Sequence, residues 1–145
     1  TPPPSMTTEQ RRIQAFEYFK RSARQGFERA QIACGCCFQY GIGVAKNEQK
    51  AVELYQLAAN QHQSLDGRNL LGLMYQNGIG VKRDLFVALG LFSETGSRHH
   101  LANALYHLAS CYFVGGGGFE KNQSRAFDFF EQAADYGLAK AQSSV

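Results

Sequence analysis

The middle of the chain reads Gly72-Leu73-Met74-Tyr75-Gln76-Asn77-Gly78-Ile79-Gly80-Val81. Thirty-seven positions earlier it reads Gly35-Cys36-Cys37-Phe38-Gln39-Tyr40-Gly41-Ile42-Gly43-Val44, and thirty-seven positions later it reads Ala109-Ser110-Cys111-Tyr112-Phe113-Val114-Gly115. Each copy has a small residue, an aromatic residue three positions later, and a glycine three positions after that. A fixed period of this length is the mark of stacked structural repeats. We therefore expect a repeat array.

The composition argues against several classes of function. Charged residues make up 19% of the 145 residues and the net charge is only +3, which is too little to favour nucleic acid or a membrane surface by electrostatics alone. No apolar run reaches the length of a membrane helix, and no signal sequence opens the chain. The chain begins with Thr1 and not with Met, so we interpret it as a segment of a longer protein.

The apolar periodicity predicts helices throughout, and hence an all-α fold. Residues 1–6 are Pro-rich and are expected to form a linker. A first helix is expected from a capping box of Thr7 and Gln10 to a stop at Gly26. The further helices are expected at Glu28–Tyr40, from the N-cap Asn47 through Ala59, and at Leu65–Asn77, Asp84–Thr95, Leu101–Val114 and Asn122–Tyr136, with another beginning at Leu138.

Two positions of the repeat hold a small residue in every copy, and we call each such set of equivalent positions a column. Small residues are needed where helices cross closely. One contains Ala23, Ala59, Gly96 and Ala134, and the other contains Ala30, Gly67, Ala104 and Ala141. A third column holds the large residues Phe19, Tyr55, Phe92 and Phe130. The glycines Gly41 and Gly78 end helices where a positive φ is wanted, so we interpret them as structural and not as a phosphate-binding loop.

Taken together, these columns resemble the Sel-one-like repeat (SLR), a relative of the tetratricopeptide repeat. The resemblance is strongest from Gly67 to Gly96 and covers everything after the Pro-rich start. It implies a right-handed α-solenoid of antiparallel helix pairs, a tetratricopeptide-like superhelix. The expected domain spans residues 7–145 and comprises a part-unit 7–26, full units of about 27–62, 63–99 and 100–137, and a truncated unit 138–145. Because Ala109 replaces the motif glycine and Gly115–Gly118 lengthens one turn, we expect the third full unit to pack differently.

No catalytic or metal-binding pattern is present in the sequence. The cysteines Cys34, Cys36 and Cys37 lack the paired spacing of a zinc site, and Cys37, Met74 and Cys111 share one apolar column that we assign to the core. His62 and His99 fall at expected inter-repeat turns. We therefore expect no enzyme activity, no cofactor and no metal. The crowded cysteines favour reduced thiols and a cytoplasmic setting.

The resemblance also implies where a partner would bind. In related repeats, positions i, i+3, i+7 and i+10 of the first helix of each pair line the concave groove. In this sequence these positions are Arg29, Ile32, Cys36, Gln39, Asp66, Asn69, Leu73, Gln76, Asn103, Tyr106, Ser110 and Phe113. Their mixture of amides, charges and apolar side chains suits an extended peptide or a helix of another protein. The alternative is that this face is simply solvated, or covered by further repeats.

The predicted function is a non-enzymatic protein–protein interaction module, an adaptor or scaffold of the kind that SLR proteins supply in signalling, membrane-protein quality control and cell-wall synthesis. An open-ended array also predicts end-to-end self-association unless terminal helices cap it. Binding of RNA by a helical repeat is the alternative function, although the modest charge and the single groove arginine, Arg29, disfavour it. An enzyme is the third alternative, and no residue supports it.

Overall fold

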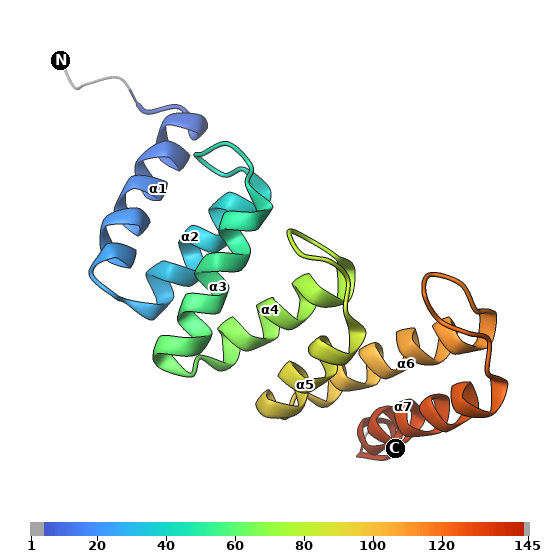
Figure 1. Cartoon of the computed structure of the whole chain (residues 1–145). Helices are drawn as coiled ribbons and strands as arrows, with labels where there is room; N and C mark the ends of the chain where they lie inside the picture. The colour runs from blue at the N-terminus through green and yellow to red at the C-terminus, as the bar shows by residue number, and fades with distance from the viewer. Residues whose placement is uncertain (1–4, 144–145) are drawn as a thin grey trace.

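The structure, a computed structural model, describes the backbone of residues 5–143 and the side chains of residues 5–137. Within this part the chain forms seven helices, which are α1 (Thr8–Arg24), α2 (Glu28–Tyr40), α3 (Glu48–His62), α4 (Leu65–Asn77), α5 (Leu85–Thr95), α6 (Arg98–Val114) and α7 (Gln123–Ser143). Each packs mainly on its neighbours in sequence, so the helices form one row from α1 to α7 (Figure 1). The expected all-α repeat fold is confirmed. Residues 1–4 of the expected linker and 144–145 of the expected truncated unit lie outside the described residues.

The pairs α2–α3, α4–α5 and α6–α7 are the three full units, and α1 occupies the place of a second helix. Figure 1 shows that the long loops joining the first and second helix of each pair lie along one edge of the array. The short turns that join one unit to the next lie on the opposite edge. This arrangement gives the array two chemically distinct edges and two faces on which a partner could bind.

Capping bonds confirm four of the predicted helix starts, those at Thr7, Asn47, Asp84 and Asn122. The Thr7 hydroxyl accepts a bond from the backbone N–H of Gln10 at 3.1 Å, and the side chain of Gln10 accepts one from the backbone of Thr7 at 2.9 Å. The side-chain oxygens of Asn47, Asp84 and Asn122 accept from the first turns of α3, α5 and α7 at 3.0–3.2 Å. Each such cap stabilises a helix by about 1 kcal/mol relative to alanine.

Helix α6 begins at Arg98, three residues earlier than the sequence predicted. The expectation that His99 is a turn residue is therefore wrong, since it lies in the first turn of α6. Two contacts accompany this extra turn. Locally, the Ser97 hydroxyl lies 2.6 Å from Nδ1 of His100, and across to α5 the His100 ring stacks on Phe92 with the ring centres 4.9 Å apart. Burial, and then the neighbouring His99, lower the pKa of His100, so this packing favours the neutral imidazole.

Helix α7 continues without a break through Gly137 to Ser143. The separate helix expected from Leu138 is therefore wrong. Glycine permits the left-handed turn that ends a helix but does not impose it. At Gly26 the turn forms, with φ 90°, and α2 then packs back on α1. Gly137 has no such positive φ.

Buried aromatic rings lie over glycines within each of the first two full units. A Cβ atom at Gly72 would lie 2.5 Å from the Phe92 ring, and a Cβ at Gly35 would lie 2.5 Å from the Tyr55 ring. Both rings are fully buried. The motif glycine is therefore needed because it lets the second helix approach the first closely enough to bury a whole ring.

The second glycine of each long loop fixes the distance between units. A Cβ at Gly80 would lie 2.5 Å from the carbonyl oxygen of Glu48 in α3, and one at Gly43 would collide with the carbonyl of Arg12 in α1. Each of these loops therefore packs directly on the backbone of the preceding second helix. Both glycines also have φ near 70°, which other residues rarely adopt.

Candidate functional site

The predicted groove residues differ widely in exposure. The exposed members are Arg29, Asp66, Asn103, Tyr106 and Phe113. The half-buried members are Ile32, Cys36, Gln39, Asn69, Leu73 and Ser110, and Gln76 is buried. The face of the first helices (α2, α4 and α6) therefore presents one charge of each sign, one amide and two aromatic rings, while the remaining side chains are partly or wholly occupied by packing.

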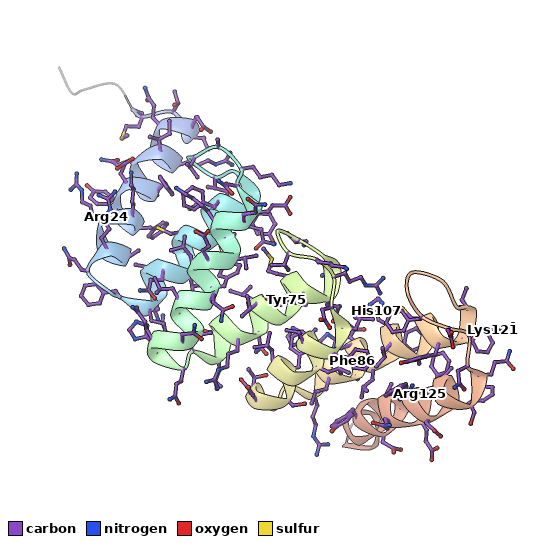
Figure 2. All side chains as sticks on the ribbon, in the orientation of Figure 1. Arg24, Tyr75, Phe86, His107, Lys121 and Arg125 are labelled. Carbon is purple, nitrogen blue, oxygen red and sulfur yellow. The ribbon has the colours of Figure 1, made fainter. Side chains whose placement is uncertain are left out.

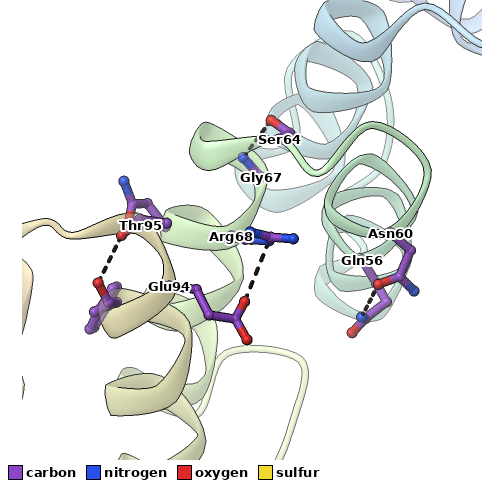
Figure 3. A network of polar contacts seen from close by, with 9 residues as sticks. Gln56, Asn60, Ser64, Gly67, Arg68, Glu94 and Thr95 are labelled. Atoms are coloured by element: carbon purple, nitrogen blue, oxygen red, sulfur yellow. Dashed lines mark hydrogen bonds and ion pairs between the residues drawn. The ribbon is translucent and has the colours of Figure 1, made fainter.

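Two polar residues of the predicted groove, Gln39 and Asn69, are hydrogen-bonded to the second helix of their own unit. The Tyr55 hydroxyl donates to Oε1 of Gln39 at 2.7 Å and lies 3.3 Å from the Cys36 thiol. Burial, and then the contact with Cys36, raise the pKa of Tyr55 above its usual range. Asn69 accepts from the Thr95 hydroxyl at 2.7 Å (Figure 3). These groups are already partnered, so a ligand gains little by bonding them.

Gln76 is a correction to the predicted groove. Its exposed fraction is 7%, and its Oε1 atom has no hydrogen-bond partner among the described residues. The reason is positional: Gln76 follows Gly72 by four residues, so both lie on the face of α4 that packs against α5. Leu73 is also partly buried, against the core cluster that contains Ala88 and Phe92. Neither residue is freely presented to a partner.

The structure gathers exposed aromatic rings on the third full unit. Tyr106 lies 5.4 Å from Phe130, and Phe113 lies 6.3 Å from both Phe127 and Phe130, measured between ring centres. We call Tyr106, Phe113, Phe127 and Phe130 the aromatic cluster. Tyr106 is 58% exposed and Phe127 is 59% exposed. Exposed aromatic clusters of this kind are typical of protein-binding surfaces.

The ring of Phe130, the equivalent of the buried rings of Tyr55 and Phe92, is only half-buried. Two features accompany this exposure: Ala109 stands where the first two units have glycine, and within the described residues no further unit packs on α7. The expectation that the third unit packs differently is confirmed. The sequence singled out Ala109, Tyr106 and Phe113, but it did not predict that α7 would add rings to the same face.

Beside the cluster lies a cleft of about 340 Å³ between α6 and α7. Asn103 and Tyr106 line it together with Phe130, Ala133 and the exposed Ala134. Ala133 is buried like its equivalent Ala58, whereas Ala134 is exposed although its equivalent Ala59 is buried. The structure thus brings Asn103 and Tyr106 to one apolar opening with a polar rim.

The cysteines occupy two kinds of environment. Cys34 and Cys37 are buried, as a core assignment predicts, whereas Cys36 is half-buried. Cys111 is a correction: it is also half-buried, it lines an open cleft, and Nη2 of Arg83 lies 3.7 Å from its sulfur. Burial, and then the neighbouring Cys37, raise the pKa of the Cys34 thiol to about 11, and burial also raises that of Cys37.

We expect these thiols to react in a defined order. Because the thiolate is the nucleophile, burial and a raised pKa both slow alkylation of Cys34 and Cys37. In the native protein at neutral pH, iodoacetamide should label Cys111 before these two, at least about tenfold faster. Peptide mapping by mass spectrometry gives the order, and labelling in urea provides the control, since all four thiols should then react at similar rates. Equal native rates would contradict the burial of Cys34 and Cys37.

Across residues 5–143 no helix is long and apolar enough to cross a membrane. Among the same residues no group of three or more histidine, cysteine or carboxylate side chains could hold a metal ion. The candidate site is the first-helix face with its aromatic cluster, because the exposed rings and the neighbouring cleft lie there.

The family model of the Sel1 repeat matches the chain over residues 10–27, 28–62, 65–97 and 102–138. Among curated proteins, the chain is 30% identical to Chitin synthase regulatory factor 2 of Schizosaccharomyces pombe, over 97% of this chain and 29% of that protein. It is 32% identical to Protein sel-1 homolog 2 of Rattus norvegicus, over 66% of this chain and 15% of that protein. The chain thus spans less than a third of the length of either relative.

Two solved structures have the same fold. A Sel1 repeat protein from Oxalobacter formigenes matches with a TM-score of 0.58 and 26% identity, covering 86% of this chain and 50% of that one. A protective antigen of uropathogenic Escherichia coli that displays an SLR fold matches with a TM-score of 0.59 and 22% identity, covering 92% of this chain and 28% of that one. Both comparisons agree with the row of helix pairs described above.

Proposed function

Because the chain belongs to the Sel1 repeat family, we propose that it is a non-enzymatic interaction module that binds a peptide or helix of another protein along its first-helix face. Repeats of this family generally act as protein-interaction modules. The relative named Chitin synthase regulatory factor 2 fits an adaptor role. The more specific part of the proposal, that the partner supplies a peptide or helix and that this segment binds on the first-helix face, rests on the geometry of this chain.

The observation that carries the proposal is the aromatic cluster with its neighbouring cleft. Aromatic side chains at protein interfaces contribute a large part of the binding free energy, because they bury a large area at a small entropic cost. Tyr106 and Phe113 are seven residues apart on α6, so they can contact two successive turns of a docked helix. Asn103 adds a polar contact at the edge of the cleft. Arg29 and Asp66 extend the face toward α2 with one charge of each sign.

Site-specific photocrosslinking tests which face binds. A photoreactive amino acid at the exposed positions Asp66 and Asn103 on first helices should give a covalent adduct with one protein of the native extract. The same group at Asn60 and Gln132, exposed positions on second helices, is the matched control and should give no such adduct. Adducts from the second helices alone would overturn the assignment, and adducts with RNA would favour the alternative function.

Truncating the aromatic cluster should then weaken binding of the crosslinked partner. We expect the double variant Tyr106→Ala with Phe113→Ala to lose about 2 kcal/mol or more of binding free energy, measured by titration calorimetry with the purified partner. Tyr18→Ala is the matched control, because Tyr18 is 57% exposed but lies on α1, away from the cluster. Circular dichroism confirms that each variant is folded. An equal loss in both variants would contradict the proposed face.

A further inference from the structure

We propose that the cleft between the α4–α5 loop and α6 is a second docking site, which binds an acidic segment of a partner protein. Its volume is about 560 Å³, and its walls include Lys82, Arg83, Phe86, His107, Cys111 and the Gly115–Gly117 loop. We call it the loop cleft. Of the predicted groove residues, only Ser110 lines the loop cleft. The loop cleft is therefore a different surface from the first-helix face, and this proposal does not depend on the proposed function.

The loop cleft exists because the last long loop does not close on the preceding unit. At the two earlier junctions, Gly43 and Gly80 pack on the backbone of α1 and α3. In the longer loop, a Cβ at Gly116, Gly117 or Gly118 would meet no atom of the described chain within 4 Å. The loop bonds to itself instead, with two backbone hydrogen bonds between Gly116 and Phe119 at 2.9 and 3.0 Å. The opening between this loop and the start of α5 is therefore specific to this junction.

Aromatic contacts hold the loop in that position. The Phe119 ring lies 6.5 Å from Phe86 of α5 and 5.2 Å from Tyr112 of α6, measured between ring centres. Phe119 thereby bridges two units at the end of the loop cleft. Figure 2 shows Phe86 on α5 and His107 on α6 in the same part of the molecule. The loop cleft thus has a fixed apolar wall and is not merely a gap between loops.

The basic groups of the loop cleft lack carboxylate partners. Within the described part of the chain, the recorded ion pairs include neither Lys82 nor Arg83. The only carboxylate in the lining, Asp84, already accepts bonds from the backbone N–H groups of Phe86 and Val87 at 3.1 and 3.2 Å. With Lys82 and Arg83 against this one carboxylate, the lining carries a net formal charge of +1, which an anionic side chain would neutralise.

The previous junction provides an internal comparison. Lys46 precedes the N-cap Asn47, just as Arg83 precedes the N-cap Asp84, so the two cations occupy equivalent positions. Lys46 lies 3.9 Å from the Glu48 carboxylate. The residue equivalent to Glu48 after Asp84 is Leu85, which is buried. The cation thus has a carboxylate partner at one junction, whereas at the next, within the described residues, Arg83 has only the weak contact of its Nη2 with the Cys111 sulfur at 3.7 Å.

The occupant that fits is a peptide with carboxylate and apolar side chains together. A guanidinium group binds a carboxylate through charge-assisted, bidentate hydrogen bonds. Phe86 is 53% exposed and Val114 is 74% exposed, so apolar side chains of the peptide can cover them. Single-stranded nucleic acid fits less well, because it requires aromatic faces free for base stacking and Phe86 is already stacked on Phe119.

Fluorescence anisotropy with the full chain tests the proposal. The probe is a fluorescein-labelled peptide of alternating Glu and Leu, and the comparison peptide carries Gln in place of Glu. We expect the Glu peptide to bind, with an affinity that falls as salt is added, and the Gln peptide to bind at least about tenfold more weakly. The variant Lys82→Glu with Arg83→Glu should lose at least about tenfold in affinity for the Glu peptide. Lys46→Glu is the matched control and should change it by less than about twofold.

Two readouts place the peptide on the molecule. Binding should shift the backbone amide resonances of Gly115–Gly117 and Phe119, and it should slow alkylation of Cys111, which lines the loop cleft. Absence of binding, equal affinity for the Gln peptide, or an equal loss in Lys46→Glu would each overturn the proposal. Protection of Cys111 by oligouridine but not by the Glu peptide would also overturn it, in favour of nucleic acid. If the variant Lys82→Glu with Arg83→Glu is not folded, Arg83→Gln must still weaken binding of the Glu peptide. Tyr106→Ala must leave the affinity for the Glu peptide unchanged.

Discussion

Replacing Gly80 by alanine is expected to destabilise the protein by about 2–5 kcal/mol. The new Cβ atom would lie 2.5 Å from the Glu48 carbonyl oxygen and 3.0 Å from Val52 Cγ2, and the backbone at Gly80 has φ 72°. The substitution therefore combines a left-handed conformation with a backbone collision between two units. Neither can be relieved by rotating a side chain, so the loop must move away from α3.

Gly90→Ala is the matched control and should have the opposite effect. Gly90 lies in the interior of α5, and a Cβ there would meet no described atom within 4 Å. Alanine in a helix is favoured over glycine by about 0.5–1 kcal/mol, so this variant should be stabilised. Urea denaturation followed by circular dichroism measures both. Because coupling between neighbouring units makes a repeat array cooperative, Gly80→Ala should also broaden the transition. Equal stabilities would contradict the close packing of this loop.

Replacing Phe92 by alanine is expected to cost about 3–5 kcal/mol of unfolding free energy. Its ring is fully buried, lies over Gly72 and stacks on His100, so truncation leaves a cavity between α4, α5 and α6. We expect the loss of the His100 contact to shorten α6 at its N-terminal end as well. Urea denaturation gives the free energy, and amide exchange of residues 98–101 reports the fraying.

Phe130→Ala, at the equivalent position of the third full unit, should cost only about 1–2 kcal/mol. Phe130 is half-buried, and within the described residues no further unit packs on it, whereas Phe92 also contacts His100 of the next unit. The two variants remove the same side chain from equivalent positions of the repeat, so the difference in unfolding free energy measures how much the closer packing around Phe92 contributes. If Phe130→Ala costs as much as Phe92→Ala, the partial exposure of Phe130 is wrong.

Helix boundaries were predictable where a local signal fixes them. The capping box at Thr7 and the N-caps Asn47, Asp84 and Asn122 work through bonds within one turn, so sequence spacing suffices. The start of α6 was predicted three residues too late; its first turn carries the stacking of His100 on Phe92, a contact between helices that sequence spacing does not show. The course of α7 through Gly137 was not predictable, because a glycine allows a turn without imposing it.

The candidate site was predictable only in part. Tyr106 and Phe113 were placed on the first-helix face by their register, and both are exposed. Gln76 was placed there by the same rule, yet it is buried, because its position four residues after Gly72 turns it toward α5. The register of a residue gives the direction in which its side chain points around the helix axis. It does not give the distance to the next helix, which decides whether that side chain is buried.

The sequence by itself determined the repeat, the all-α fold and most of the helix starts and ends, because periodicity, capping bonds and left-handed glycines act within a few residues of the chain. Only the tertiary structure decided which surfaces remain open. Gly80 closes one loop onto α3, while Gly116–Gly118 leave the equivalent space at the next junction as the loop cleft. The Phe130 ring, whose equivalents Tyr55 and Phe92 are buried, likewise stays half-buried and joins the exposed aromatic cluster. Both outcomes depend on how closely neighbouring helices and loops approach one another, which residue spacing along the chain does not encode.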